Sequence, residues 1–404
     1  MNAQRRPPAA RPAPGRDRRP TRAAVRRRRV GALALLLAVA VVLGVALAAL
    51  GGSGTNAGSG APGRHAGNRA GQRPPGGQSV SQTASSHTTS TTSSSETHHA
   101  PRAAYRVGIT QMVLNEPSSP AIATGHTASG QPVRVLPTVV RYPARGLPDG
   151  SSHPGAPPDT ADGPFPLVVF SQGFDISAEA YSGLLNAWAK AGFVVADPTY
   201  PDTDPASHET VNESDMVNHP ADLRYTISSL QSAGHDPHSV LNGLIGNRLG
   251  IVGHSDGGDV TLAVAANTCC QDHGVDAAVI LSGAELAGFG GSYYSGGSVP
   301  LLVAQGSADT INIPGCSAQL YDGAPQPKYY LNIAGAEHQP PYMEPGPTRD
   351  GVARTVIAFL DAYLKSEPKR LQAVAHGSGL PPNESVTSAP TLPAGTSTVC
   401  PGAP

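Results

Sequence analysis

The chain has 404 residues, including 47 Gly and 40 Pro, and its 28 basic and 29 acidic side chains give a formal net charge of −1 at pH 7. This balance conceals an asymmetry, because residues 1–29 contain 11 Arg and one acid, whereas acidic residues outnumber basic ones in the rest of the chain. A basic head is common in nucleic-acid-binding proteins, but the apolar segment that follows it here argues against nucleic acid as a partner.

That apolar segment, residues 30–50, contains no polar side chain. As a helix it would be ~31 Å long, which is enough to cross a bilayer. Since the Arg26–Arg29 block directly precedes it, the positive-inside rule predicts that residues 1–29 are cytoplasmic and that the rest of the chain is outside the cell. We therefore expect a single-pass signal anchor in the cell membrane. The alternative is a cleaved signal peptide, with Ala46–Ala48 as the cleavage signal and a secreted product.

Two further segments have compositions that cannot build a hydrophobic core. Residues 51–102 are rich in Gly, Ser and Thr, and residues 376–404 are rich in Pro, Ser and Thr. We expect the first to be a disordered linker and the second to be an irregular tail. A single folded domain is therefore predicted over residues 103–375, a size that is normal for an α/β enzyme.

Within this domain, short β-rich runs alternate with helical patterns, which predicts an α/β fold with a mostly parallel, eight-stranded sheet flanked by helices. The runs are continuously apolar, as in strands that are buried on both faces. The first two strands are expected to be antiparallel. The eight expected strands are Tyr105–Leu114, Val133–Pro143, Phe165–Ser171, Phe193–Pro198, Leu249–Ser255, Asp276–Gly283, Val299–Gly306 and Lys328–Gly335.

Two helices have clear apolar stripes. The first is expected to start at a capping Ser177 and to end at Gly192, with Tyr181 and Trp188 among its apolar positions. The second closes the domain over about residues 352–364.

The four cysteines, Cys269, Cys270, Cys316 and Cys400, lack the spacing of a zinc site, so no metal is predicted. Outside the cell they could form two disulfides. A bridge between adjacent cysteines would be strained, so we expect Cys269 or Cys270 to pair with Cys316 or Cys400, without choosing a pairing.

The sequence "LGIVGHSDGGDV" places Ser255 between an apolar strand and a helical pattern. The motif G-x-S-x-G is informative only in this context, where a sharp turn lifts the serine hydroxyl to the edge of the sheet. Side chains at the flanking Gly253 and Gly257 would collide with neighbouring elements. We therefore interpret Ser255 as a nucleophile rather than as part of a structural loop.

A nucleophilic serine needs a base and an acid that orients the base. His338 follows the last expected strand, in "AEHQPPY", and Asp309 follows the strand before it, in "GSAD". Glu285, at the end of an earlier strand, is the alternative acid. The order Ser255, Asp309, His338 is that of α/β-hydrolases and differs from the orders of the two main serine protease groups.

An oxyanion hole is expected from two backbone N–H groups. One is that of Asp256, the residue after the nucleophile, and the other is that of Phe174, in the loop "SQGFDIS" after the third strand. The Asp256 side chain is acidic where negative charge would develop, so we expect it to point away from the oxyanion.

These motifs resemble the α/β-hydrolase superfamily over roughly residues 103–368. The stretches that carry the resemblance are "LPTVVRYPA", "VVFSQGF", "GHSDGG", "GSAD" and "AEHQPPY". Among its members, the chain looks most like lidless serine esterases, namely dienelactone-hydrolase-like enzymes, platelet-activating-factor acetylhydrolases and cutinase-type polyester hydrolases. Dienelactone hydrolases themselves use a cysteine where this chain has Ser255, which counts against that activity.

The resemblance implies ester hydrolysis through an acyl-enzyme, without a metal or organic cofactor. Residues 284–298 are too few for a helical lid, and residues 199–222 form the longest irregular insertion, which could build a wall of the site. We expect an exported, membrane-anchored serine esterase acting on small-molecule, lipid or polymeric esters. The alternatives are a catalytically silent scaffold that serves as a cell-envelope binding module, and a serine peptidase on the same fold.

Overall fold

The structure, a computed structural model, describes residues 104–205, 210–397 and 399–401. These residues all fall within one compact unit, Ser95–Pro404. The predicted membrane anchor, residues 30–50, and the predicted linker, residues 51–102, lie outside the described residues. Among the helices that are described, none is both long enough and apolar enough to cross a membrane.

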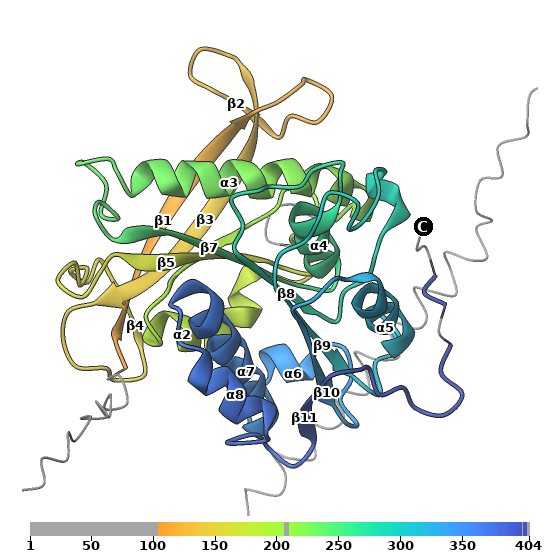
Figure 1. The fold of residues 1–404 in the computed structure, drawn as a ribbon. Coiled ribbons are helices and arrows are strands. Elements are labelled where there is room, and N and C mark those ends of the chain that lie inside the picture. Colours follow the sequence, from red (N-terminus) through yellow and green to blue (C-terminus); the bar gives the residue numbers. More distant parts are fainter. Residues whose placement is uncertain (1–103, 206–209, 398, 402–404) are drawn as a thin grey trace, which may run out of the picture. The chain divides into compact units, whose positions relative to one another are not determined.

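A mixed sheet of eleven strands forms the centre of this unit (Figure 1). Its six central strands, β10 to β6 in spatial order, are parallel to one another, and antiparallel strands flank them. The spatial order is β11 (Glu384–Thr387), β10 (Lys328–Ile333), β9 (Leu301–Gly306), β8 (Ala277–Leu281), β7 (Ile245–His254), β5 (Phe165–Ser171), β6 (Val194–Pro198), β3 (Pro132–Ala144), β1 (Arg106–Pro117) and β4 (Ser152–Pro154), with β2 (Gly125–His126) paired to β3.

Helices cover both faces of the sheet and bury a separate apolar core on each (Figure 1). One face packs against α3 (His219–Ala233), α4 (Asp256–Ala266) and α5 (Pro314–Gly323). The other packs against α2 (Ser182–Lys190), α6 (Pro340–Met343), α7 (Pro347–Leu364) and α8 (Pro368–Ala375). Three short 3-10 helices lie in connections, η1 (Ala178–Tyr181), η2 (Glu213–Asn218) and η3 (Ala287–Phe289).

The predicted α/β class is confirmed, and all eight expected strands are present, the first two of them antiparallel. The sheet nevertheless has three more strands than predicted, β2, β4 and β11. These are strands of two to four residues, too short to produce a recognisable apolar pattern. The tail expected over residues 376–404 is therefore not irregular throughout, because β11 pairs with the edge strand β10.

The helix expected from Ser177 to Gly192 begins differently. Residues Ala178–Tyr181 form η1, and α2 starts only at Ser182. Ser177 has the extended backbone of a capping residue, but its side chain makes no capping hydrogen bond. Gly192 has a φ of +90° and follows the end of α2, as expected for a glycine that terminates a helix.

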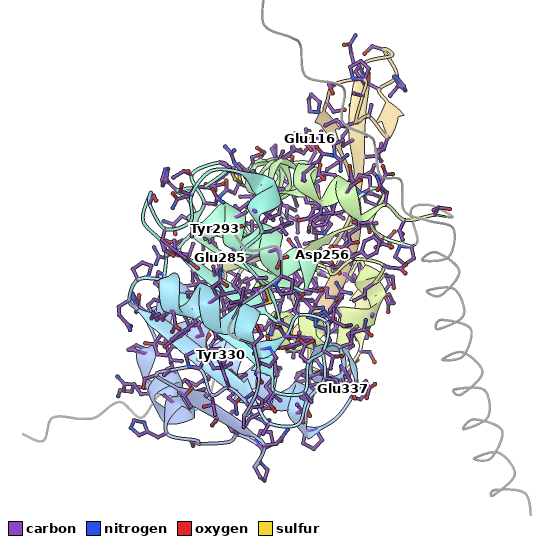
Figure 2. All side chains as sticks on the ribbon, turned by 90° about the vertical axis from the view of Figure 1, so that its right-hand side faces the viewer. Glu116, Asp256, Glu285, Tyr293, Tyr330 and Glu337 are labelled. Atoms are coloured by element: carbon purple, nitrogen blue, oxygen red, sulfur yellow. A yellow bond between two sulfur atoms is a disulfide. The ribbon has the colours of Figure 1, made fainter. Side chains whose placement is uncertain are left out.

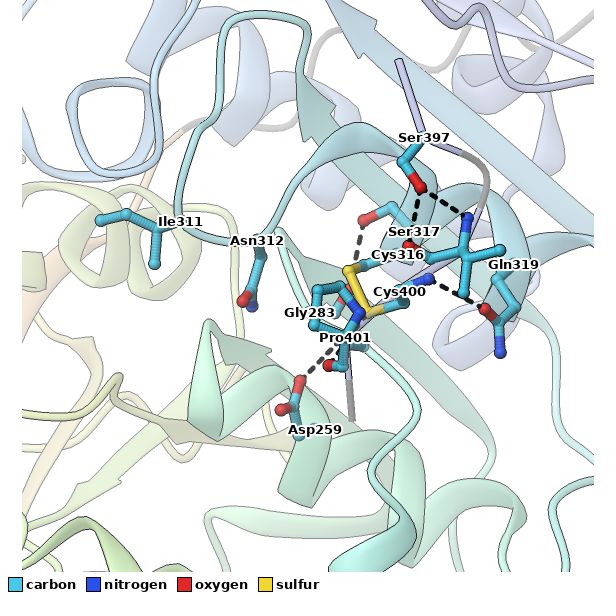
Figure 3. The surroundings of a disulfide bond; sticks show 12 residues. Asp259, Gly283, Ile311, Asn312, Cys316, Ser317, Gln319, Ser397, Cys400 and Pro401 are labelled. Atoms are coloured by element: carbon cyan, nitrogen blue, oxygen red, sulfur yellow. Dashed lines mark hydrogen bonds between the residues drawn. A yellow bond between two sulfur atoms is a disulfide. The ribbon is translucent and has the colours of Figure 1, made fainter. Parts of the chain in front are cut away.

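The predicted disulfide arrangement is wrong. Cys269 pairs with its neighbour Cys270 in the turn after α4, and Cys316 on α5 pairs with Cys400. The tail returns to α5, where the amide of Cys400 donates to the side chain of Gln319 and the two cysteine Cα atoms lie 4.5 Å apart (Figure 3). Since this pair uses both of the more distant cysteines, Cys269 and Cys270 have only each other.

The insertion between β6 and α3 is fixed by a buried ion-pair cluster. Arg134 on β3 donates to Asp215 on η2 and to Asp222 on α3, each at 2.7 Å. A buried arginine is stabilised when carboxylates satisfy its fork of N–H donors, as they do here. The same insertion contacts the loop after β5, because the Asp175 N–H donates to the carbonyl of Thr203 at 3.0 Å.

Candidate active site

Ser255 occupies a strained turn between β7 and α4. Its φ of 57° and ψ of −128° lie in a region that non-glycine residues rarely adopt. Its N–H donates to the carbonyl of Leu281 on β8, and its carbonyl accepts from Gly258 in the first turn of α4. Bonds on both sides therefore maintain the strained backbone, and the serine lies at the carboxyl edge of the sheet.

The glycines of this turn are sterically required, as the sequence predicted. A Cβ on Gly253 would overlap the carbonyl oxygen of Gly257, and a Cβ on Gly257 would overlap the carbonyl oxygen of Ser171. These are backbone atoms that cannot move aside without displacing a strand. The close approach of α4 to the end of β5 thus depends on the absence of side chains.

We expect Gly257→Ala to destabilise the fold and to abolish ester turnover, because the added methyl group forces apart the Ser255 turn and the loop after β5. Overpacking of this kind typically costs about 1–3 kcal/mol, and more against backbone. Gly288→Ala is a matched control, since the nearest atom to its Cβ is 3.6 Å away in Leu286. Thermal denaturation measures the effect, and equal melting temperatures for the two variants would contradict it.

The structure brings Ser255, His338 and Asp309 together in one hydrogen-bonded chain. His338 Nε2 lies 2.8 Å from Ser255 Oγ, and His338 Nδ1 lies 2.7 Å from Asp309 Oδ2. All three residues are buried, with relative exposures of 7% for Ser255, 4% for His338 and 3% for Asp309. A carboxylate only accepts, so Nδ1 carries the proton and Nε2 is free to accept from the serine hydroxyl.

Asp309 is fixed by four hydrogen bonds. Its Oδ1 accepts from the N–H groups of Ile311 and Asn312, at 2.9 and 3.1 Å, and its Oδ2 accepts from Gln305 at 3.0 Å in addition to His338. Glu285, the alternative acid, has a different environment: its carboxyl group interacts with the side chains of Tyr294 and Gln319, and burial raises its pKa. The geometry therefore favours Asp309 as the partner of His338.

The loop after β5 lies against the serine. A Cβ built on Gly173 would be 3.0 Å from Ser255 Cβ, which is closer than most contacts of a real Cβ, so any side chain here would push this loop away from the serine. Phe174 follows it, and Asp256 is the first residue of α4. Within the described part of the chain, the N–H groups of Phe174 and Asp256 donate to no other residue's backbone carbonyl. Neither amide of the predicted oxyanion hole is therefore held by a backbone carbonyl, although the Asp256 N–H interacts with its own carboxyl group.

A comparison with protein families gives a match over part of this domain. A family model described as Chlorophyllase matches residues 156–283, a range that includes the loop after β5 and the Ser255 turn. The family consists of α/β-hydrolase-like serine esterases. The predicted resemblance to the α/β-hydrolase superfamily is confirmed. The match indicates an esterase-type hydrolase. No curated protein matches the chain in a direct sequence comparison.

Other features of this hydrolase bear on the chemistry of the site. The connection between β8 and β9 contains only the single 3-10 turn η3, so no helical lid arises there. Among the described residues, no group of three or more His, Cys, Asp or Glu side chains could hold a metal ion.

Sequence reasoning missed two residues that support the site, Gln305 and Tyr181. Gln305 lies at the end of β9, where its amide bonds with Asp309 and with Ser317. Ser317 is adjacent to the Cys316–Cys400 disulfide (Figure 3). A polar residue inside an otherwise apolar buried strand is the signal that could have identified Gln305. Tyr181 was interpreted as an apolar helix position, and its hydroxyl group gave no sequence signal.

Asp256 has an unusual environment next to the nucleophile (Figure 2). Its Oδ2 is buried and has no hydrogen-bond partner among the described residues. Burial and the nearby carboxylate of Glu213 raise its pKa to about 6, although His338 and the N–H of Asp256 itself act in the opposite direction. The side chain is therefore ionised at neutral pH, at a cost to the fold, and it belongs to the residue whose N–H is one of the two predicted oxyanion donors.

We expect Asp256→Asn to stabilise the protein and to increase kcat/KM for neutral esters above pH 6. The raised pKa means that the neutral carboxyl is favoured in the fold, so its stabilisation is complete below pH 4 and is lost as the pH rises through about 6. The gain in melting temperature should therefore be present at pH 8 and absent at pH 4. If repulsion from the Asp256 carboxylate destabilises the oxyanion by about 1 kcal/mol, its removal corresponds to a rate increase of about fivefold.

Proposed function

We propose that this protein is an exported serine hydrolase that cleaves carboxylic esters through an acyl-enzyme intermediate. Ser255 Oγ attacks the ester carbonyl while His338 Nε2 accepts the hydroxyl proton. Asp309 orients the imidazole and stabilises its charged form. His338 then donates the proton to the departing alkoxide, so the alcohol leaves and the acyl group stays on Ser255.

A water molecule completes the reaction by the same route. His338 removes a proton from the water, which attacks the acyl carbon, and the proton returns to Ser255 Oγ as the acid is released. In both steps negative charge develops on the carbonyl oxygen, where the N–H groups of Phe174 and Asp256 would donate to it. Such donors typically contribute about 10²–10³-fold in rate.

The observation that carries this proposal is the continuous hydrogen-bonded chain from Ser255 through His338 to Asp309, with distances of 2.8 and 2.7 Å. A silent scaffold would have no need to keep a strained serine, a correctly oriented imidazole and a saturated carboxylate together. The family description supports ester rather than peptide bonds as the substrate.

The decisive experiment uses the full chain in detergent-solubilised membranes. A fluorophosphonate probe is expected to label it, and short p-nitrophenyl esters are expected to be hydrolysed. Profiling acyl chains of increasing length then distinguishes small-molecule from lipid or polymeric esters. A folded protein that neither reacts with the probe nor turns over any ester would instead be the scaffold that serves as a cell-envelope binding module.

We propose that the apolar residues 30–50 anchor the protein in the cell membrane, with residues 1–29 cytoplasmic and the hydrolase outside. Protease treatment of intact cells is expected to degrade the hydrolase and to leave a small membrane-bound fragment. Recovery of an active, shortened chain in the culture medium would favour the alternative of a cleaved signal peptide.

A further inference from the structure

A buried polar pair, Tyr181 and His254, lies behind the reactive groups and is not part of the triad. Both residues are fully buried. Tyr181 Oη lies 2.8 Å from His254 Nδ1 and accepts the N–H of Gly173 at 3.2 Å. His254 Nε2 lies 3.0 Å from the carbonyl oxygen of His338. The pair therefore joins the loop after β5, the Ser255 turn and the loop that carries the base.

For a neutral His254, only one set of donors and acceptors satisfies these contacts. A carbonyl oxygen only accepts, so His254 Nε2 must carry a proton and donate it to His338. In the neutral imidazole, Nδ1 then accepts, and Tyr181 Oη must donate to it. These three hydrogen bonds form a relay that runs in one direction, from the Gly173 N–H through Tyr181 and His254 to the backbone carbonyl of His338. Burial and the nearby His338 lower the pKa of His254 well below its usual value, in agreement with a neutral ring.

The consequence concerns the loop after β5, which we call the oxyanion loop because it carries the Phe174 N–H. A Cβ on Gly173 would be 3.3 Å from His254 Nδ1 and 3.0 Å from Ser255 Cβ, so this glycine is enclosed by the turn residues. Because the Gly173 amide is bound by Tyr181, the peptide plane between Gln172 and Gly173 is fixed. The direction of the following amide, that of Phe174, depends on this orientation.

We propose that Tyr181 and His254 are positioning residues that hold the oxyanion loop and the backbone of His338 in register with Ser255. The proposal rests on the proposed function. It predicts that the Tyr181 hydroxyl contributes to the stabilisation of the transition state, whereas its ring contributes to packing. The ring contacts Phe170 with 4.7 Å between centroids, and a phenylalanine would preserve this contact.

The test is Tyr181→Phe, which removes the hydroxyl group that links Gly173 to His254. We expect kcat to fall by about tenfold or more, somewhat less than the loss of an entire oxyanion donor, with KM nearly unchanged. A trifluoromethyl ketone, which forms a tetrahedral oxyanion adduct with the serine, should bind more weakly by the same factor. A purely structural role would lower the melting temperature without making these two losses parallel.

Tyr142→Phe is the matched control. Tyr142 is equally buried, on β3, and its hydroxyl donates to the carbonyl of Ala156 at 2.9 Å, outside the relay. We expect it to lower stability comparably and to leave kcat and ketone binding unchanged. His254→Gln is a second variant, because its amide can still donate to the carbonyl of His338, and should retain more activity than His254→Leu.

Two results overturn the proposal. The first is a folded Tyr181→Phe that keeps wild-type kcat and ketone affinity, and the second is equal activity of the two His254 variants. Failure of the proposed function gives a different result, since the wild-type protein itself would then neither hydrolyse esters nor bind the ketone.

Discussion

Replacing Ser255 by alanine is expected to lower kcat for p-nitrophenyl esters by about 10³-fold or more, with little change in melting temperature. The substitution removes the atom proposed to attack the carbonyl, and within the described part of the chain Ser255 Oγ hydrogen-bonds to His338 alone. His338→Ala should cost a similar factor. The double variant should be no worse than either single variant, because the two residues act as one unit.

Labelling with a fluorophosphonate reports on the same atom independently of turnover. Ser255→Ala should lose the label, while Ser232→Ala should keep it, because Ser232 is exposed on α3 and its hydroxyl donates to the carbonyl of Ser228. Retention of both label and activity in Ser255→Ala would show that another residue is the nucleophile, and the proposed mechanism would then be abandoned.

The parts of the fold that the sequence predicted are those that depend on local pattern. Strands buried on both faces, such as Phe165–Ser171, are continuously apolar, and the observed β5 has the predicted bounds. The Ser255 turn was predictable for a similar reason, because Gly253, Ser255 and Gly257 lie within five consecutive positions. The turn needs small residues at fixed spacing, so one short stretch of sequence is enough to predict it.

Features that depend on contacts distant in sequence were not predictable. Cys316 and Cys400 are 84 residues apart, and their pairing depends on where the tail returns. Tyr181 and His254 are 73 residues apart, and neither shows by its spacing that it bonds with the other. Such contacts are decided by tertiary packing, which overrides local preference. For the same reason, the Pro- and Ser-rich tail did not indicate β11, because this strand depends on pairing with the distant strand β10.

The choice of the acid was only partly predictable. Both Asp309 and Glu285 follow parallel strands, so both carboxylates were expected at the carboxyl edge of the sheet. What distinguishes them is the surrounding hydrogen bonding. Asp309 accepts two backbone N–H groups in its own loop, which fixes its other oxygen, Oδ2, toward His338, whereas Glu285 interacts with Tyr294 and Gln319.

Asp309→Asn is accordingly expected to lower kcat by about 10³-fold or more while preserving the fold. Asparagine has the same shape, and its oxygen can still accept from Ile311 and Asn312. Its NH₂ group would face His338 Nδ1 and donate to it, so the imidazole would take the tautomer with the proton on Nε2. A protonated Nε2 cannot accept the Ser255 proton, and the serine therefore remains unactivated.

Glu285→Gln is the matched control, since it also converts a carboxylate to an amide close to the same edge of the sheet. It should retain nearly all of the wild-type kcat, because Glu285 interacts with Tyr294 and Gln319, whereas His338 Nδ1 is hydrogen-bonded to Asp309. Measuring kcat for both variants at pH 8, with the melting temperature as a check of folding, compares the two acids directly. If Asp309→Asn kept its activity and Glu285→Gln lost it, the roles assigned to these two residues would have to be exchanged.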